Sequence, residues 1–238
     1  NIYEGTWVDD DLRQGKVVIT NPAPFIHLSR IFAKASSTSP LLYEGFFFDL
    51  LPDGKGKLTC ADYTYEGQLV LGKRCGFGSE NGEPLALYDN DEKQDINVIT
   101  DKRIYGIDIS HYQPIVSWDK LYVPVDSSYT YNDTISRQIG IIPVSFVFLK
   151  ATEGKQYFDY TYEKHCDWAE RFGIPHGAYH FYNHRMATVK EQIDNFTFHV
   201  KLNKGDLLPV LDIELFGVST DSLLVWTDAV EKYYGVKP

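Results

Sequence analysis

Asp212 and Glu214 end an apolar run of the chain and are separated by a single residue. The run from 207 to 211 is typical of a buried β-strand, and side chains two residues apart on a strand point to the same face. Two carboxylates side by side can divide into a proton donor and a charged partner. Acid-catalysed cleavage of a glycosidic bond requires such a pair.

Other strands must bring further groups to these acids. Residues 105–110, 146–151, 174–182 and 207–214 have strand patterns, and helical spacing of apolar residues is found over 162–172, 189–200 and 223–233. Strands that alternate with helices predict a parallel sheet, whose active site lies at the carboxyl ends of the strands. All four strands become polar or ionisable near that end, which favours a shared cleft. The ionisable or hydroxyl residues there include Asp108, Lys150, Glu153, Tyr179, Tyr182, Asp212 and Glu214.

The N-terminal half has a different sequence pattern, a repeated motif. The tripeptide Tyr-Glu-Gly occurs at 3–5, 43–45 and 65–67, and a Gly-x-Gly follows the second and third copies at 54–56 and 76–78. A repeat of this length with glycine at turns predicts stacked β-hairpins. We therefore expect an all-β repeat domain with a linker over 1–102 and an α/β domain over 103–238. Residues 21–40 and 120–145 are expected to be insertions, the second a loop over the cleft or a surface for a partner.

Composition limits the function. The chain has 23 basic and 33 acidic residues and a net charge of −10, and both halves are acidic, so nucleic-acid binding is not expected. No apolar run is long enough for a transmembrane helix. The chain opens at Asn1, without an initiator methionine, as it would after removal of a signal peptide or if the sequence had been trimmed. Cys60, Cys75 and Cys166 lack metal-binding spacing, so neither a metal nor a cofactor is expected; Cys60 and Cys75 could pair if the protein is exported.

The second domain resembles glycoside hydrolase family 25, the lysozymes or muramidases, in four segments that occur in the family's order. They are 106–113 (Gly-Ile-Asp-Ile-Ser-His-Tyr-Gln), 146–154 (Phe-Val-Phe-Leu-Lys-Ala-Thr-Glu-Gly), 177–181 (Gly-Ala-Tyr-His-Phe) and 208–214 (Leu-Pro-Val-Leu-Asp-Ile-Glu). The repeats resemble MORN repeats. The family's fold is a TIM-like (β/α) barrel, and too few strands are present here to close one. The resemblance thus implies a barrel incomplete at its C-terminus, which a further segment or a second polypeptide would complete.

The resemblance also implies a function. The family cleaves the β-1,4 bond between N-acetylmuramic acid and N-acetylglucosamine in peptidoglycan, and no cofactor is implied. By position, Glu214 matches the general acid, Asp212 its partner and Asp108 the acid of the first strand. Tyr179 matches a position in the sugar cleft, and Tyr112, Lys150, Glu153 and Tyr182 are further candidates for substrate binding. A substrate in the cell wall predicts a secreted, periplasmic or envelope-associated protein.

Several alternatives stay open on these residues. The substrate's acetamido oxygen could attack C1 while Asp212 orients or charges it, or Asp108 could activate a water in an inverting route; the acetamido groups favour the first. Lys150 and Glu153 are expected to form an ion pair in the barrel mouth rather than to take part in chemistry, and His180 to be a hydrogen-bonded core residue. The rival function is a peptidoglycan-binding or anchoring protein that does not cut and whose repeats make the interaction.

Overall fold

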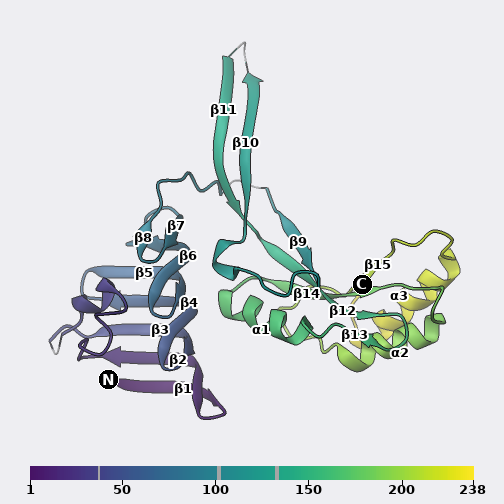
Figure 1. The fold of residues 1–238 in the computed structure, drawn as a ribbon, viewed down its shortest axis with the longest axis horizontal. Coiled ribbons are helices and arrows are strands. Elements are labelled where there is room, and N and C mark those ends of the chain that lie inside the picture. The colour runs from purple at the N-terminus through teal and green to yellow at the C-terminus, as the bar shows by residue number, and fades with distance from the viewer. Residues whose placement is uncertain (37, 101–102, 132–133) are drawn as a thin grey trace. The chain divides into compact units, whose positions relative to one another are not determined.

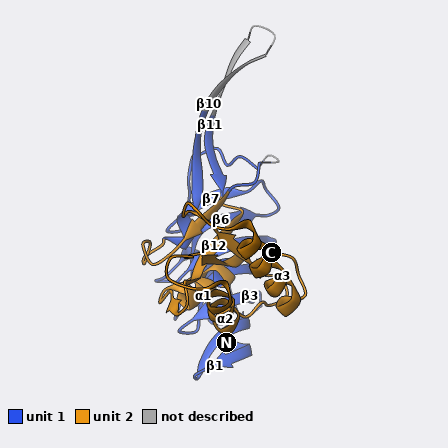
Figure 2. Cartoon of the chain, turned by 90° about the vertical axis from the view of Figure 1, so that its right-hand side faces the viewer, with its two compact units in different colours: residues 1–105, 117–143, 171–173 blue, residues 106–116, 144–170, 174–238 orange. Residues whose placement is uncertain are grey.

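The computed structural model describes residues 1–36, 38–100, 103–131 and 134–238. The chain divides into two compact units, which Figure 2 shows in different colours. Unit 1 consists of Asn1–Tyr105, Ser117–Pro143 and Arg171–Gly173, and unit 2 of Gly106–Val116, Val144–Glu170 and Ile174–Pro238. Residues 117–143, which the sequence analysis included in the second domain, therefore cluster with the repeat unit.

Unit 1 is built on an eight-stranded antiparallel sheet in which each strand pairs with the next along the chain (Figure 1). Several turns are tight, as between β1 and β2, where the two connecting residues Asp9 and Asp10 both have positive φ (49° and 65°). Such turns match the natural twist of a hairpin. The strands are β1 (Ile2–Val8), β2 (Asp11–Ile19), β3 (Leu41–Phe48), β4 (Leu51–Cys60), β5 (Tyr63–Val70), β6 (Lys73–Glu80), β7 (Ala86–Asp89) and β8 (Glu92–Lys93).

The repeated residues share one packing arrangement. In the second copy, the Tyr43 hydroxyl donates a hydrogen bond to the Phe46 carbonyl oxygen (2.7 Å), and the ring lies on Gly56 of the next strand. In the third copy, the Tyr65 ring lies in the same way on Gly78. A methyl group at either glycine would overlap the ring. The Tyr-Glu-Gly and Gly-x-Gly motifs are therefore two halves of one contact.

This contact gives a testable prediction for stability. We expect Gly56→Ala to lower the free energy of unfolding by about 1–3 kcal/mol, the usual cost of inserting a methyl group into a packed site. Urea denaturation followed by fluorescence measures this. The control is Lys57→Arg, an exposed change on the same strand that keeps the positive charge, which should alter stability by less than about 0.5 kcal/mol. Equal stabilities of the two variants would show that the Tyr43 ring does not require the glycine.

The first insertion joins the core of unit 1. Its short helix η1 (Arg30–Lys34) supplies Ile31 and Phe32, and Phe32 is fully buried against the sheet. The second insertion was expected to be a loop, but it forms regular secondary structure. It contains η2 (Trp118–Lys120), and β10 (Tyr122–Tyr131) pairs antiparallel with β11 (Thr134–Pro143). The Tyr, Thr, Val and Ile residues of this stretch favour strands, and the polar residues among them masked that preference.

Unit 2 contains a sheet in which four strands run parallel. β9 and β14 both pair with β12, and β15 pairs with β14; β13 adds a short antiparallel edge to β12. The strands are β9 (Gly106–Ile109), β12 (Phe146–Glu153), β13 (Tyr157–Phe158), β14 (His176–Phe181) and β15 (Val210–Asp212), and the helices are α1 (Tyr162–Phe172), α2 (Val189–His199) and α3 (Thr220–Tyr234). The four strands and three helices predicted for this unit are confirmed; three of the strands are shorter than predicted, and β12 extends further, to Glu153. The described residues form an open parallel sheet, and a complete barrel is not formed by them.

The helices α2 and α3 pack on one face of this sheet. Their core includes Phe196, Trp226 and Val230, which contact Ala151 and Ala178 of the strands. His180 lies on this face, fully buried, with its ring nitrogens near the Thr152 hydroxyl (2.7 Å) and Gln192 Oε1 (3.2 Å). Burial lowers the pKa of His180 to about 4, so it is a neutral core histidine, as expected. The opposite face carries the candidate site.

Candidate active site

Four of the eight predicted site residues line one pocket. Asp108, Tyr179, Asp212 and Glu214 surround a cavity of about 270 Å³ together with Phe148 and residues 210, 211 and 213. Asp108 comes from β9, Tyr179 from β14 and Asp212 from the last position of β15, and Glu214 follows two residues later. Residues more than 100 positions apart in the chain are therefore brought to one place.

The strand register explains this convergence. Asp108 pairs with Phe148, and Tyr179 pairs with both Lys150 and Val210, while Asp212 lies opposite Phe181. Because side chains alternate along each strand, these positions project from the face opposite the helices. The pocket thus lies on the free face of the sheet, towards the carboxyl ends of its strands.

The acids of the pocket influence one another. Burial raises the pKa of the Asp212 carboxyl above its ordinary value, and the charges of Glu214 and Asp108 raise it further, while the Lys150 ammonium acts in the opposite direction. Asp212 is partly buried, whereas Glu214 and Asp108 are exposed. Because burial and like charges both disfavour the ionised form, the Asp212 carboxyl keeps its proton to a higher pH than an isolated aspartate does.

Tyr179 supplies a neutral hydroxyl beside the acids. Burial raises its pKa well above the ordinary value, with Asp108 and Asp212 acting in the same direction and Ser110 opposing them. The phenol therefore keeps its proton at physiological pH and can donate a hydrogen bond to a substrate oxygen.

Lys150 and Glu153 form the predicted ion pair, with 2.7 Å between Nζ and Oε2. The Lys150 ammonium is buried and lies over the ring of Phe181 at 4.8 Å from its centre. Lys150 does not line the carboxylate pocket, and its effect there is electrostatic.

Tyr182 requires a correction. We expected it to bind substrate, but it is 1% exposed and belongs to the apolar core under α2 and α3. It lies three positions after Tyr179, and an odd separation on a strand turns a side chain to the other face.

Tyr112 and Glu153 lie in a second cavity of unit 2, of about 510 Å³, which we call the aromatic pocket. Its lining consists of His111, Tyr112, residues 153–157, Asn183 and Met186. The sequence analysis did not identify His111, Asn183 or the buried Asp159 that binds His111. His111 lies within the first-strand motif over 106–113, and that position was the available signal; nothing in the sequence marks Asp159.

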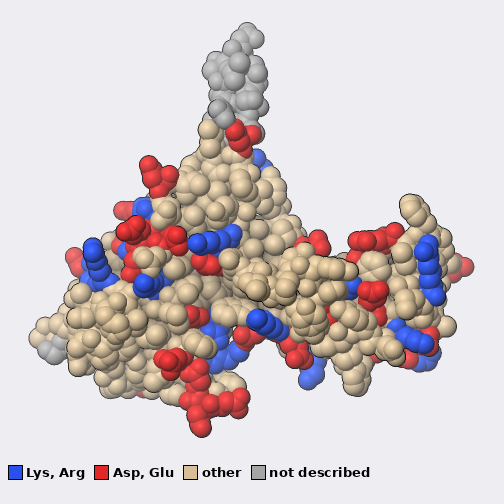
Figure 3. Space-filling view, in the orientation of Figure 1, with Lys and Arg blue, Asp and Glu red and all other residues tan. Residues whose placement is uncertain are grey.

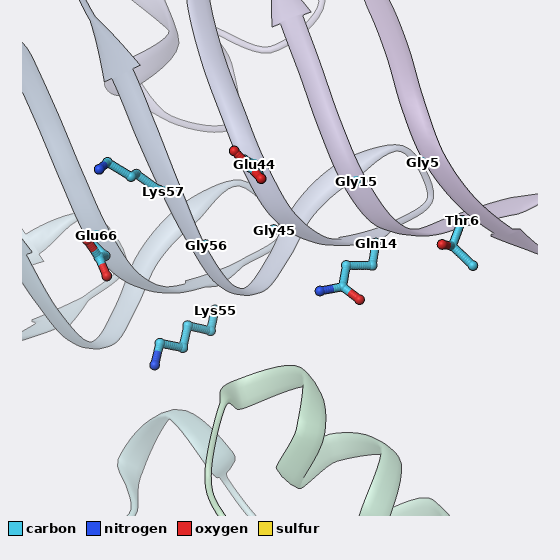
Figure 4. A pocket seen from close by; sticks show the side chains of 10 residues that line it. All are labelled: Gly5, Thr6, Gln14, Gly15, Glu44, Gly45, Lys55, Gly56, Lys57 and Glu66. Carbon is cyan, nitrogen blue, oxygen red and sulfur yellow. The ribbon is translucent and has the colours of Figure 1, made fainter. Parts of the chain in front are cut away.

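Unit 1 has a hollow of its own, on the exposed face of its sheet (Figure 4). Its floor is formed by glycines that pair across β1 to β4, Gly5, Gly15, Gly45 and Gly56. Along one side Glu44, Lys57 and Glu66 face one another from adjacent strands. Opposite charges on paired strands stabilise a sheet, so this row has a structural role. Figure 3 shows acidic and basic side chains interspersed over the face in view.

The described residues were also compared with the requirements for a metal site, a membrane-spanning helix and a disulfide. Within 1–36, 38–100, 103–131 and 134–238, no three His, Cys, Asp or Glu side chains are grouped to hold a metal ion. Among the helices of the same ranges, none combines the length and apolar character needed to span a membrane. All three cysteines are unpaired as thiols, and Cys60 and Cys75 are buried.

Comparison with known families assigns both parts of the chain. The family model of glycosyl hydrolases family 25 matches residues 107–238, and the chain belongs to this family. The MORN repeat model matches residues 43–64 and 65–81, which correspond to the second and third Tyr-Glu-Gly copies. A domain of glycosyl hydrolases family 25 is therefore preceded by MORN repeats.

Individual relatives are distant. The chain is 28% identical to the uncharacterized protein YegX of Escherichia coli O157:H7 over 148 residues (60% of this chain, 49% of YegX). It is 28% identical to Lysozyme M1 of Streptomyces globisporus over 141 residues (55% and 42%). The chain thus spans about half the length of the curated relatives that it matches.

Two solved structures show a partial similarity. A family 25 glycosyl hydrolase from Bacillus anthracis matches with 23% identity and a TM-score of 0.44, over 59% of this chain and 60% of that chain. A muramidase from Trichobolus zukalii matches with 26% identity and a TM-score of 0.43, over 57% and 63%.

Proposed function

We propose that this chain is a muramidase, which hydrolyses the β-1,4 bond between N-acetylmuramic acid and N-acetylglucosamine in peptidoglycan. The observation that carries the proposal is the pocket in which Asp108, Asp212 and Glu214 meet beside Tyr179. Membership of family 25 and the similarity to a protein named lysozyme support the substrate class. Because peptidoglycan lies outside the cytoplasm, we also propose that the protein acts in the envelope or after secretion.

Glu214 is the proton donor in this mechanism. It stands at the exposed rim of the pocket, where a glycosidic oxygen can reach it, and Asp212 lines the same pocket. Transfer of that proton to the leaving oxygen accompanies cleavage of the bond between C1 and that oxygen. The Tyr179 hydroxyl lies in the same pocket and can orient the sugar.

Asp212 acts on the positive charge that develops at C1. In the route that we favour, the substrate's acetamido oxygen forms a bond to C1. The Asp212 carboxylate orients the acetamido group and increases the negative charge on its oxygen. Water then attacks C1, the acetamido bond breaks, and Glu214 recovers its proton. In the alternative inverting route Asp108, also in the pocket, removes a proton from the attacking water.

The identity of the bond is tested by the new reducing ends. Purified peptidoglycan is digested with the protein and reduced with borohydride, and the reduced sugars are identified by mass spectrometry. A muramidase produces reduced muramic acid. Reduced glucosamine would assign the activity to the other glycosidic bond, and binding to the wall without soluble fragments would favour the non-cutting alternative.

A further inference from the structure

Asp159 is a fully buried carboxylate that lines neither the carboxylate pocket nor the aromatic pocket. It directly follows β13, and its backbone N–H donates to the carbonyl oxygen of Ala151 in β12 (2.8 Å). Removing an ionised carboxylate from water is costly unless its oxygens accept hydrogen bonds. The groups that hydrogen-bond to Asp159 therefore indicate its role.

Four hydrogen bonds converge on this carboxylate. Its Oδ1 atom accepts from the backbone N–H (3.0 Å) and the hydroxyl (2.6 Å) of Thr161. Its Oδ2 atom accepts from the backbone N–H of His111 (3.0 Å) and lies 2.7 Å from the Nδ1 atom of the same residue. Burial alone would raise the pKa of Asp159, but these hydrogen bonds outweigh it and lower that pKa. The carboxylate is therefore ionised at physiological pH and binds His111 at two points.

His111 belongs to a tight turn at the end of β9. The Ser110 carbonyl oxygen accepts from the backbone N–H of Gln113 (2.8 Å), and Gln113 Oε1 accepts from the backbone N–H of Ser110 (3.1 Å). Asp108 of the carboxylate pocket lies two residues before this turn. Through His111, Asp159 thus fixes the turn that directly follows the first strand of the site.

Ser110 connects this turn to the carboxylate pocket. Its hydroxyl is hydrogen-bonded to the hydroxyl of Tyr179. Ser110 is 7% exposed, so little water competes for this bond. Burial raises the pKa of Tyr179, and the charge of Asp159 acts in the same direction. A path of hydrogen bonds and one peptide link therefore runs from Asp159 through His111 and Ser110 to the phenol that lies beside the acids.

We propose that Asp159 is a positioning residue of the active site, which holds the Tyr179 hydroxyl, through His111 and Ser110, in the orientation that binds the sugar. The inference rests on the proposed function, because it takes Tyr179 to contact the substrate. Misplacing a contacting group by about 1 Å can lower a rate by about 100-fold. A carboxylate outside the pocket can therefore influence the reaction without touching the substrate.

A double-mutant cycle in the full chain tests this path. Asp159→Asn leaves one acceptor oxygen for donors on both sides. We expect it to lower kcat for soluble peptidoglycan fragments about ten- to hundred-fold and to change KM by less than about three-fold. Tyr179→Phe should lower kcat by a similar factor. Adding Asp159→Asn to Tyr179→Phe should then lower the rate by less than about two-fold more, because residues that act through one another are not additive.

Two further variants separate positioning from stability. Asp53→Asn removes a similarly buried aspartate (4% exposed) from unit 1, so it should lower the urea unfolding midpoint and leave kcat unchanged. His111→Ala removes the ring hydrogen bond at a partly exposed position. It should therefore fold even if Asp159→Asn does not, and should lower kcat in the same direction by a smaller factor.

The nuclear magnetic resonance of isotope-labelled tyrosine gives a readout that does not depend on hydrolysis. The Cζ resonance of Tyr179, assigned by its absence from Tyr179→Phe, reports the surroundings of the hydroxyl. It should change position in Asp159→Asn and in His111→Ala, and stay in place in Asp53→Asn.

The outcomes distinguish this inference from the proposed function. Equal losses of kcat from Asp159→Asn with and without Tyr179→Phe would overturn the positioning role, and so would an unchanged Tyr179 resonance. If the wild type does not hydrolyse peptidoglycan but the resonance moves in Asp159→Asn and not in Asp53→Asn, the path to Tyr179 stands and the proposed function is wrong.

Discussion

Replacing Glu214 with glutamine should lower the rate of peptidoglycan hydrolysis by about 10³-fold, within the 10²–10⁴-fold range of a general acid. The amide has the size and shape of the carboxyl but cannot transfer its proton. Because Glu214 is exposed, the substitution should leave the urea unfolding midpoint close to that of the wild type. Release of soluble reducing ends from purified cell walls measures the rate.

A second glutamate distinguishes loss of the acid from a general defect. Glu231→Gln is the matched control, since Glu231 is an exposed glutamate of α3 outside both pockets of unit 2. If Glu214→Gln hydrolysed cell walls at a rate near that of Glu231→Gln, Glu214 would not be the acid.

Asp212→Asn should have opposite effects on activity and on stability. We expect hydrolysis to fall by about 10²–10³-fold, because the anion that stabilises positive charge near C1 is lost. At pH 7 the variant should nevertheless be more stable to urea than the wild type, because the wild type must hold a partly buried charge beside Glu214 and Asp108.

The sign of the pH dependence follows from the raised pKa. In the unfolded chain Asp212 has the ordinary aspartate pKa of 3.8. The folded protein therefore binds the Asp212 proton more tightly than the unfolded chain does. The stabilising contribution of this proton is complete below that value and is lost as the pH rises through the folded-state pKa. The stability gain of Asp212→Asn should therefore be present at pH 7 and vanish near pH 3.

Asp228→Asn, at an exposed position of α3, controls for the loss of one negative charge from this acidic chain. Its stability relative to the wild type should change little between pH 7 and pH 3. If Asp212→Asn were less stable than the wild type at pH 7, the partly buried charge of Asp212 would not be destabilising.

Sequence patterns were sufficient where the signal is local. The helical stripe over 162–172 coincides with α1, and Gly173 follows it with positive φ (67°), as expected of a residue that ends a helix. The spacing of Asp212 and Glu214 predicted a shared face, and both line one cavity. Local patterning failed for residues 120–145, where polar residues within two strands were interpreted as a loop.

The sequence by itself determined the order of strands and helices, the repeat motif and the acids at the strand ends, because each of these depends on spacing within a short stretch of chain. Only the tertiary structure decided which of the candidate residues share a cavity. Tyr179 and Tyr182 have similar local patterns, yet one lines the carboxylate pocket and the other lies in the core. The pairing of His111 with Asp159, 48 residues away, likewise depends on the register between distant strands, which no local spacing encodes.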